Sequence, residues 1–189
     1  LSSSSAASDV YKRQLFTGLL TSFKYLQHWA PCYDFGIFSQ MFNYMKETLQ
    51  PLTTCERDGL LSHFAVHFSP IYYLLLPFFF IFPSPVTLLM GQAAIIASGL
   101  IPLYLICKRH KLSNAAVILF SLCYVLLPSM ANGCFFFLHE NKFLTPLILW
   151  LAFALEKNKW IPSVIFTLLL LAVKEDAPVY AAVLGLYFI

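Results

Sequence analysis

Residues 60–107 read LLSHFAVHFSPIYYLLLPFFFIFPSPVTLLMGQAAIIASGLIPLYLIC, and this stretch contains no Asp, Glu, Lys or Arg. Large apolar side chains would cover every face of the helices that such a run can form. A 189-residue soluble domain has too little interior to bury them all, whereas the hydrocarbon core of a bilayer is a suitable solvent. The stretch therefore predicts an integral membrane protein, in which the few charged residues either set the topology or carry function.

The composition of the whole chain points the same way. Hydrophobic residues make up 59% of the chain and charged residues 11%, against about 25% charged residues in typical soluble domains. The net charge of +3 is small and scattered, so nucleic acid is not expected as a partner. The five cysteines show no CxxC or other metal-site spacing. A divalent metal ion is therefore not supported by ligand spacing, and the cofactors stay unknown.

The N-terminal part divides into three segments. Residues 1–14 are rich in Ser and Ala, lack the layout of a signal peptide, and are expected to be a disordered, non-native tail. Residues 15–30 are a modest apolar segment, interpreted as a first membrane helix. Residues 31–66 are the extended polar region and are expected to be an extracytoplasmic loop. Within it, Gly36–Leu49 repeats apolar side chains at helical spacing, which predicts an amphipathic helix lying on the membrane.

The rest of the chain predicts an all-α fold, a polytopic integral membrane helical bundle. Residues 67–82 are short and interrupted by proline, so they either lie in the interface or span a thinned bilayer. The expected transmembrane helices are 85–108, 113–130, 142–156, 160–174 and 177–189. The last of these stops within an apolar run, so the chain is expected to be a fragment of a longer protein.

Lysine and arginine set the expected orientation, because loops rich in these residues stay in the cytoplasm. The two basic clusters, Lys108–Lys111 and Glu156–Lys159, are separated by two expected spans and so fall on the same, cytoplasmic side. The loop 131–141 and the charged knot Lys174–Asp176 then fall on the outer face. Asp34 also lies there if residues 67–82 do not cross the bilayer.

Two candidate sites come from the first half of the chain. Asp34, beside aromatic residues near the expected membrane surface, has the chemistry of a general base or a cation ligand. The alternative is a helix N-cap, since a helical pattern follows it. His63 and His67 lie four residues apart and would share a helix face, a spacing compatible with two metal ligands. The alternatives are interfacial anchoring and hydrogen bonding to an anionic substrate.

Two more candidates lie in the second half. His139 and Glu140 follow an apolar run and would serve as proton-transfer partners or orient a substrate, unless they simply solvate a loop. Lys174, Glu175 and Asp176 interrupt another apolar run. A snorkelling lysine with Asp176 as N-cap explains part of this knot, but three adjacent charges at a membrane helix end exceed what a cap requires.

Taken in order, four of these motifs resemble those of a family of predicted prokaryotic integral membrane proteins of unknown function. The motifs are Tyr33–Gln40, His67–Pro70, Phe137–Glu140 and Lys174–Asp176, where the family pattern looks like YDLGIFDQ, HFSP, DFHPE and KED. The resemblance covers the chain from about Pro31 to its end and implies the cytoplasmic (inner) membrane of a prokaryote. Ser39 stands where the pattern has an acid, which weighs against a metal role for that helix.

That family is in turn similar to the GT-C superfamily of membrane glycosyltransferases, of which this chain would be the N-terminal part. The similarity implies a sugar donor linked to a lipid phosphate and a catalytic acid in the first extracytoplasmic loop, which maps to Asp34. Lys174 or His67 would then face the phosphate leaving group. The candidate residues are Asp34, His139 and Glu140 for catalysis, and Tyr33, His67, Lys174, Glu175 and Asp176 for substrate binding.

Three functions therefore stay open at this point. The first is a membrane glycosyltransferase whose partners are membrane lipid and a lipid-linked sugar donor. The second is a transporter or carrier, which should show inverted repeats and charges in the middle of helices; here the charges lie at helix ends. The third is a non-catalytic membrane protein. The sequence does not identify the donor, the acceptor or the oligomeric state.

Overall fold

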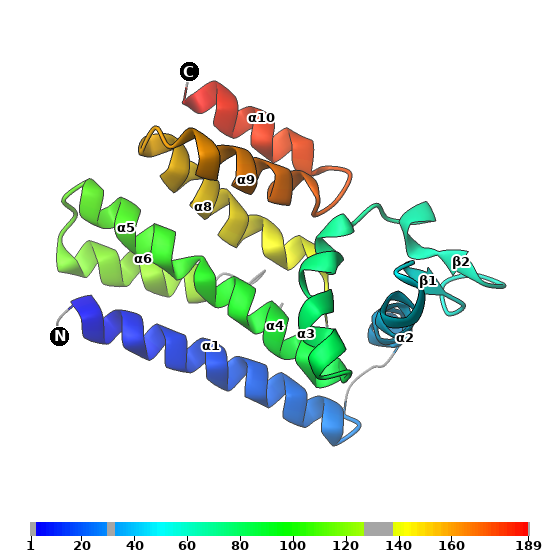
Figure 1. Cartoon of the computed structure of the whole chain (residues 1–189). Coiled ribbons are helices and arrows are strands. Elements are labelled where there is room, and N and C mark those ends of the chain that lie inside the picture. Colours follow the sequence, from blue (N-terminus) through cyan, green and yellow to red (C-terminus); the bar gives the residue numbers. More distant parts are fainter. Residues whose placement is uncertain (1–2, 30–32, 127–137, 189) are drawn as a thin grey trace.

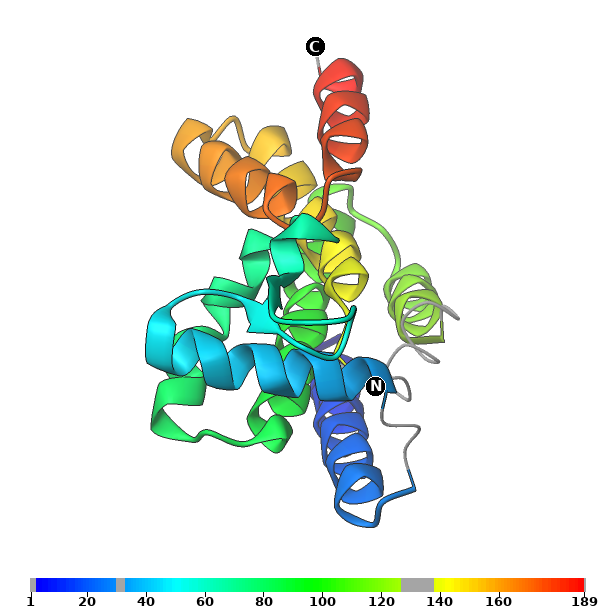
Figure 2. The same cartoon turned by 90° about the vertical axis from the view of Figure 1, so that its right-hand side faces the viewer.

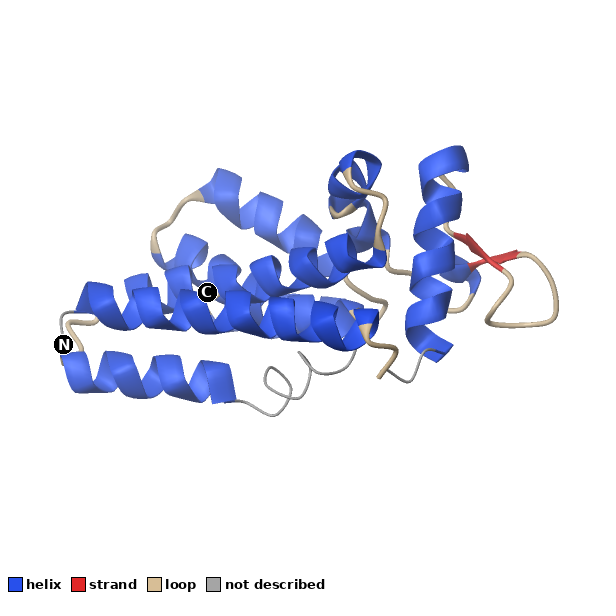
Figure 3. Cartoon of the chain, turned by 90° about the horizontal axis from the view of Figure 1, so that it is seen from below, coloured by secondary structure: helices blue, strands red, loops and turns tan. Residues whose placement is uncertain are grey.

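The computed structural model describes residues 3–29, 33–126 and 138–188, which are mostly helical (Figures 1 and 3). The helices that run along the bundle in Figure 1 are α1 (Ser3–Leu26), α4 (Pro85–Ser98), α5 (Leu100–Arg109), α6 (Asn114–Leu126), α8 (Leu144–Glu156), α9 (Trp160–Leu171) and α10 (Ala177–Tyr187). The short elements are α3 (Leu76–Ile81) and the 3-10 helices η1 (His63–Ala65), η2 (Pro70–Leu74) and η3 (Glu140–Phe143). α2 (Tyr33–Thr48) lies across one end of the bundle (Figure 2).

The first helix is longer than the sequence analysis expected. α1 begins at Ser3, so most of the segment 1–14 is helical rather than disordered. Ser and Ala are compatible with a helix, and residues 1–17 contain no proline or glycine to end one. The helix that packs on α4 therefore extends toward the N-terminus. The contact with α4 is close at Gly18, where an added Cβ would lie 3.0 Å from the Cβ of Ala93.

The apolar stripe of α2 is buried against protein rather than against lipid. Met41, Phe42 and Met45 are fully buried. The ring of Phe42 lies 5.4 Å from that of Phe79 on α3, between ring centroids. The amphipathic helix is confirmed. The expectation that its apolar face lies on the membrane is wrong, because aromatic side chains of η2 and α3 cover that face.

A short hairpin follows α2 and departs from the all-α expectation. β1 (Leu52–Thr53) pairs antiparallel with β2 (Leu61–Ser62), and the strands lie beside α2 (Figure 3). Gln40 of α2 holds the hairpin: its Oε1 accepts from the Thr53 hydroxyl at 2.9 Å and from the Thr54 backbone N–H at 2.8 Å. One amide side chain thus fixes β1 on α2.

Residues 67–82 do not form one continuous helix. Proline stands in the first turn of both η2 and α3, and α3 is only 6 residues long. A single membrane-spanning helix needs about 20 residues, so this segment is not one. Whether it lies within the interface stays a prediction.

The helix expected over 85–108 is divided at Gly99. Pro102 has no backbone N–H, so the carbonyl four residues before it loses its helical partner. The hydroxyl of Tyr124 approaches Gly99 closely and donates a hydrogen bond to the Ile96 carbonyl at 2.6 Å. The break is therefore filled by a side chain of α6.

Charged and polar groups gather at the two ends of the bundle, as the sequence predicts. At one end, a guanidinium N–H of Arg109 donates to the Glu156 carbonyl at 2.9 Å, and His110 Nε2 lies 3.1 Å from Glu156 Oε1. At the other end, the N–H of Ile71 donates to the Ala172 carbonyl at 2.8 Å and joins η2 to the end of α9. The basic loops and the acidic motifs are thus separated by the length of the helices.

Within the described residues, one helix is long and apolar enough to cross a membrane: the 25 residues Pro85–Arg109, counted through the break. α6, α9 and α10 are apolar but shorter, with 13, 12 and 11 residues. The end of the helix expected at 113–130 and residues 131–137 of the following loop lie outside the described residues. The polytopic arrangement therefore stays a prediction.

We expect Gly99→Ala to destabilise the fold. The new Cβ would meet the Tyr124 hydroxyl and lie 2.9 Å from the Cβ of Pro146, and such overpacking costs about 1–3 kcal/mol. The control is Gly185→Ala on α10, where a Cβ would meet nothing within 4 Å and a helical alanine is favoured over glycine. Thermal unfolding of the full-length protein in detergent should show a lower midpoint for Gly99→Ala alone. Equal midpoints for the two variants would contradict close packing at the break.

Candidate functional site

The site is organised around the carboxylate of Glu140, in the first turn of η3. Its side chain is only 2% exposed, and three groups surround it. The Tyr72 hydroxyl donates to Oε2 at 2.6 Å, Lys174 Nζ lies 3.4 Å from Oε1, and His139 Nδ1 lies 3.3 Å from Oε2. A buried carboxylate is tolerated only when it is paired and hydrogen-bonded, and these contacts satisfy that condition.

Two aromatic rings hold Tyr72 in position on η2. Tyr72 is fully buried, and the ring centroids of Phe38 and Phe42 on α2 lie 5.2 and 6.0 Å from its own. The neighbouring Ile71 N–H is bonded to the end of α9, just before Lys174. The packing of α2 and the α9–α10 loop on η2 therefore brings the hydroxyl and the ammonium to the same carboxylate.

His139 is positioned from α4. Its backbone N–H donates to Oε1 of Gln92 at 3.0 Å, and Gln92 is buried on α4. The imidazole itself is 47% exposed, so it lies at the border between the buried carboxylate and the outside. A buried amide on the apolar helix thus fixes the start of η3 and directs an accessible histidine beside Glu140.

Two opposed effects set the pKa of Glu140. Burial raises it, but His139, the Tyr72 hydrogen bond and Lys174 together outweigh burial and lower the pKa below its ordinary value. Glu140 is therefore ionised at neutral pH. The pKa of Tyr72 is raised, first by burial and then by the Glu140 charge, so the phenol keeps its proton and donates it.

The pKa of His139 is lowered, first by burial, which disfavours the charged imidazolium. The positive charges of Lys142 and Lys174 act in the same direction. The charges of Glu140 and Asp34 oppose this shift without cancelling it. His139 is thus neutral at pH 7, and its positive charge assists Glu140 only at acidic pH. At neutral pH the ionised carboxylate depends on Lys174 and Tyr72.

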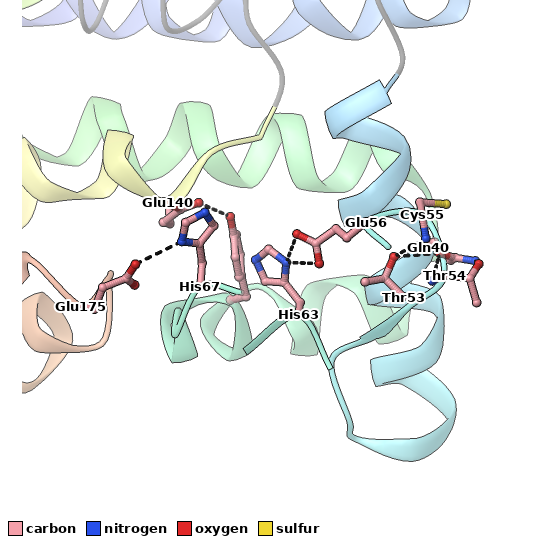
Figure 4. Close-up of polar contacts among 10 residues, drawn as sticks. Gln40, Thr53, Thr54, Cys55, Glu56, His63, His67, Glu140 and Glu175 are labelled. Carbon is pink, nitrogen blue, oxygen red and sulfur yellow. Dashed lines mark hydrogen bonds and ion pairs between the residues drawn. The ribbon is translucent and has the colours of Figure 1, made fainter. Parts of the chain in front are cut away.

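A second pair lies next to this cluster. His67 Nδ1 is 3.1 Å from Glu175 Oε1 (Figure 4), and the two side chains are 43% and 51% exposed. Hydrogen bonding to backbone N–H first, and to His67 second, lowers the pKa of Glu175. The pair joins the start of the segment 67–82 to the residue that follows Lys174, so the sequence motifs of His67 and of Lys174–Asp176 meet in space.

Asp34 lies at the edge of the same region. It is exposed, inside the first turn of α2, so it does not hold the N-cap position that precedes the helix. Its charge acts on the pKa of His139, which places the two groups within electrostatic reach. The side chain of Tyr33 lies outside the described residues. Asp176 is exposed and is the N-cap residue of α10, without a capping hydrogen bond from its side chain.

Three contributors were missed from the sequence. Tyr72 and Gln92 stand in apolar runs as ordinary helix residues, and their partners are 68 and 47 residues away. The third is Glu56, whose two carboxylate oxygens both lie 2.9 Å from Nδ1 of the buried His63 (Figure 4). For Tyr72 and Gln92, the available signal is the rarity of polar side chains in apolar runs, which marks each one for a specific partner.

The metal alternative for His63 and His67 gains no support from the geometry. Their ring centroids are 6.2 Å apart, but Nδ1 of His63 is taken by Glu56 and Nδ1 of His67 by Glu175. Among the residues that the structure describes, no three His, Cys, Asp or Glu side chains are grouped to hold a metal ion. The arrangement instead offers an accessible carboxylate, an accessible imidazole and a lysine, which suit proton transfer and the binding of an anion.

Comparison with known proteins gives one finding. A family model described as "Predicted membrane protein (DUF2079)" matches residues 28–189. The comparison with curated proteins and the comparison with solved structures give no match.

Glu140 should make stability depend on pH. Because folding lowers its pKa, it stabilises the native state above its unfolded pKa, near 4.5, and this contribution is lost as the pH falls through the lower, folded pKa. Glu140→Gln should cost about 1–3 kcal/mol at pH 7, since Lys174 loses a charged partner. The melting temperatures of the variant and the wild type should converge as the pH falls below about 4.5.

The matched control is Asp176→Asn, an exposed carboxylate with no capping hydrogen bond, which should leave the melting temperature unchanged at both pH values. A difference between wild type and Glu140→Gln that keeps its full size down to pH 3 would show that the carboxylate charge does not stabilise the fold.

Proposed function

The chain belongs to the DUF2079 family of predicted membrane proteins, whose function is unknown, and from this premise we propose that it is part of a polytopic membrane glycosyltransferase. The proposed reaction moves a sugar from a lipid-phosphate-linked donor to an acceptor on the extracytoplasmic face of the cytoplasmic membrane. The observation that carries the proposal is the Glu140 cluster: an ionised, lysine-paired carboxylate beside an accessible histidine and an accessible aspartate, all at one end of an apolar bundle.

The surface of the bundle supports a polytopic arrangement. Pro85–Arg109 is long and apolar enough to cross a membrane, and the shorter helices also present large apolar side chains outward. On α9, Val164 and Leu168 are 50% and 61% exposed, and on α10, Val179 and Val183 are 63% and 61% exposed. Continuous apolar surface of this kind is unfavourable in water and favourable in lipid.

The division of charge supports the proposed orientation. Arg109, His110 and the loop after Glu156 lie together at one end, and basic loops face the cytoplasm. The end that carries Glu140 and Lys174 then faces the outside. A lipid-linked donor at this end would keep its chain in the bilayer and expose its phosphate to the site.

Inverting sugar transfer needs a base and a stabilised leaving group. In the proposed reaction, Asp34 takes the proton of the acceptor hydroxyl while the acceptor oxygen attacks the anomeric carbon. The bond from that carbon to the phosphate oxygen breaks, and the lipid phosphate leaves with the electron pair. In this proposal, Lys174 and His67 stabilise the phosphate charge.

The sequence offered proton transfer or substrate orientation for Glu140 and His139, and the proposal keeps only positioning and binding roles for them. Glu140 is buried and held ionised by its partners, which makes it a positioning residue for Lys174 rather than an acid or base. His139 is neutral at pH 7 and half-exposed, so it is suited to donate or accept a hydrogen bond with the substrate. We assign the base to Asp34, because the similarity to GT-C glycosyltransferases maps their catalytic acid to this residue and its carboxylate is accessible.

Asp34→Asn in the full-length protein should lower sugar transfer by about 100- to 10,000-fold, because a general base usually contributes that much. Membrane insertion and the melting temperature should not change, because Asp34 lies inside the first turn of α2 and not at its N-cap position. The assay follows transfer from a radiolabelled polyprenyl-phosphate sugar in membranes. The control is Asp58→Asn in the exposed turn between the strands, which should keep full activity. Near-normal transfer by Asp34→Asn would reject the proposed base.

Cysteine labelling tests the orientation in intact cells. Asp176→Cys and Lys111→Cys, each in a cysteine-free full-length protein, place a thiol at the opposite ends of the bundle, and both positions are exposed. A membrane-impermeant maleimide should label Asp176→Cys from outside and Lys111→Cys only after permeabilisation. Labelling of both thiols from the same side would overturn the arrangement.

A further inference from the structure

Basic side chains gather at the end of the bundle away from Glu140, on two segments that are far apart in the sequence. One segment is the end of α5 with the turn after it, and the other is the turn after α8 (Figure 1). Together they carry five basic residues and one carboxylate, that of Glu156. The basic residues are Lys108, Arg109, Lys111, Lys157 and Lys159, and all five are exposed. We call these five residues the basic patch.

Glu156 joins the two segments without neutralising the patch. Arg109 donates to the Glu156 carbonyl at 2.9 Å, and its Nε lies 3.5 Å from Oε2 of the same residue. His110 Nε2 lies 3.1 Å from Oε1, and the Glu156 side chain is only 16% exposed. Among the described residues, no carboxylate pairs with any of the four lysines of the patch. The patch therefore keeps an excess of positive charge at its surface.

Two of these lysines lean back along their own helices. Lys108 Nζ lies 5.8 Å from the ring centroid of Tyr104, and Lys157 Nζ lies 5.8 Å from that of Phe153. Both distances are within the range of a cation–π contact, and each ring stands four residues earlier, about one helical turn nearer the middle of the bundle. The two ammonium groups are therefore directed toward the apolar part of the surface rather than away from it.

An exposed tryptophan beside the patch indicates its depth in a bilayer. Trp160 follows Lys159 directly and is 74% exposed, and the next residue, Ile161, is 53% exposed. Tryptophan is enriched at membrane interfaces, where its ring lies at the level of the lipid head groups. The patch thus lies where the charged groups of a bilayer would be, at the edge of the outward apolar surface of α9.

We propose that the basic patch binds the phosphate head groups of anionic phospholipids in the leaflet on this side of the bundle. Clusters of lysine and arginine next to a membrane helix attract anionic lipids. The positive-inside rule explains why such residues face the cytoplasm, but it requires neither the joining of two segments through Glu156 nor lysines that lean toward the bilayer. Exposed Trp160 favours lipid over a soluble acidic partner. The proposal requires an inserted protein but no sugar transfer.

Lipid titration tests the site directly. The full-length protein in neutral detergent is titrated with phosphatidylglycerol or with phosphatidylcholine of the same acyl chains, and native mass spectrometry counts the bound lipid molecules. We expect saturable binding of phosphatidylglycerol that is at least about tenfold tighter than binding of phosphatidylcholine. Raising the ionic strength from about 0.1 M to 1 M shortens the Debye length from about 10 Å to about 3 Å, and this should remove most of the preference.

The decisive variant combines Lys108→Gln with Lys157→Gln, one lysine from each segment. Binding of phosphatidylglycerol should weaken about 25-fold, or about fivefold for each charge, while the melting temperature stays close to that of the wild type because both lysines are exposed. Lys108→Arg with Lys157→Arg keeps both charges and should bind as the wild type does. The matched control, Lys46→Gln with Arg57→Gln, removes two exposed charges from the opposite end and should also bind normally.

Three results would overturn the lipid site. The first is equal affinity for the two lipids, and the second is a preference that the glutamine variant of the patch leaves intact. The third is binding of soluble polyglutamate that the same variant abolishes, without any preference between the lipids, which would make the patch a docking surface for an acidic protein. Lipid selectivity in a protein without transferase activity would reject the proposed function alone. Active transfer without lipid selectivity would reject the lipid site alone.

Discussion

The pairing of the buried Glu140 carboxylate is the constraint on which the polar end of this protein depends. An ionised carboxylate with 2% exposure is tolerated only if its oxygens are occupied by donors and its charge is opposed. Tyr72 comes from η2 and Lys174 from the loop between α9 and α10, so the pairing joins three segments that are far apart in the sequence. If Tyr72 or Lys174 were lost, one oxygen of the buried carboxylate would lose its partner.

The same end explains why the intervening segments are short and irregular. Pro70 and Pro77 stand in the first turns of η2 and α3, which are 5 and 6 residues long, and Tyr72 lies beside Glu140 in the first of these short elements. α2 then buries its apolar face on these turns, and Gln40 fixes the hairpin on the other side. The polar end is thus a layer of short elements built across a bundle of longer helices.

The sequence predicted the features that depend on local pattern. The apolar stripe of α2, the positions of α8, α9 and α10, and the separation of the basic loops from the acidic motifs follow from helical spacing and from charge. The helix from Ser3 was missed because the Ser- and Ala-rich stretch was interpreted as a disordered tail. The filling of the break at Gly99 by Tyr124 and the burial of α2 against protein did not follow, because each depends on side chains from another element. The partners Tyr72 and Gln92 were missed for the same reason.

In the proposed function, Glu140 has a structural role and Asp34 a chemical one, and the surroundings of the two carboxylates are the reason for this division. The sequence offers both as catalytic acids or bases, and spacing alone does not separate them. A proton-transfer group must reach its substrate and change its protonation state. Glu140 is enclosed, its donors are in place, and its pKa is lowered, so proton transfer there would disrupt the contacts that hold Lys174. Asp34 is accessible and has no fixed structural partner to lose among the contacts described for it. Proton transfer at Asp34, as proposed, would therefore leave the contacts of the fold intact, whereas proton transfer at Glu140 would not.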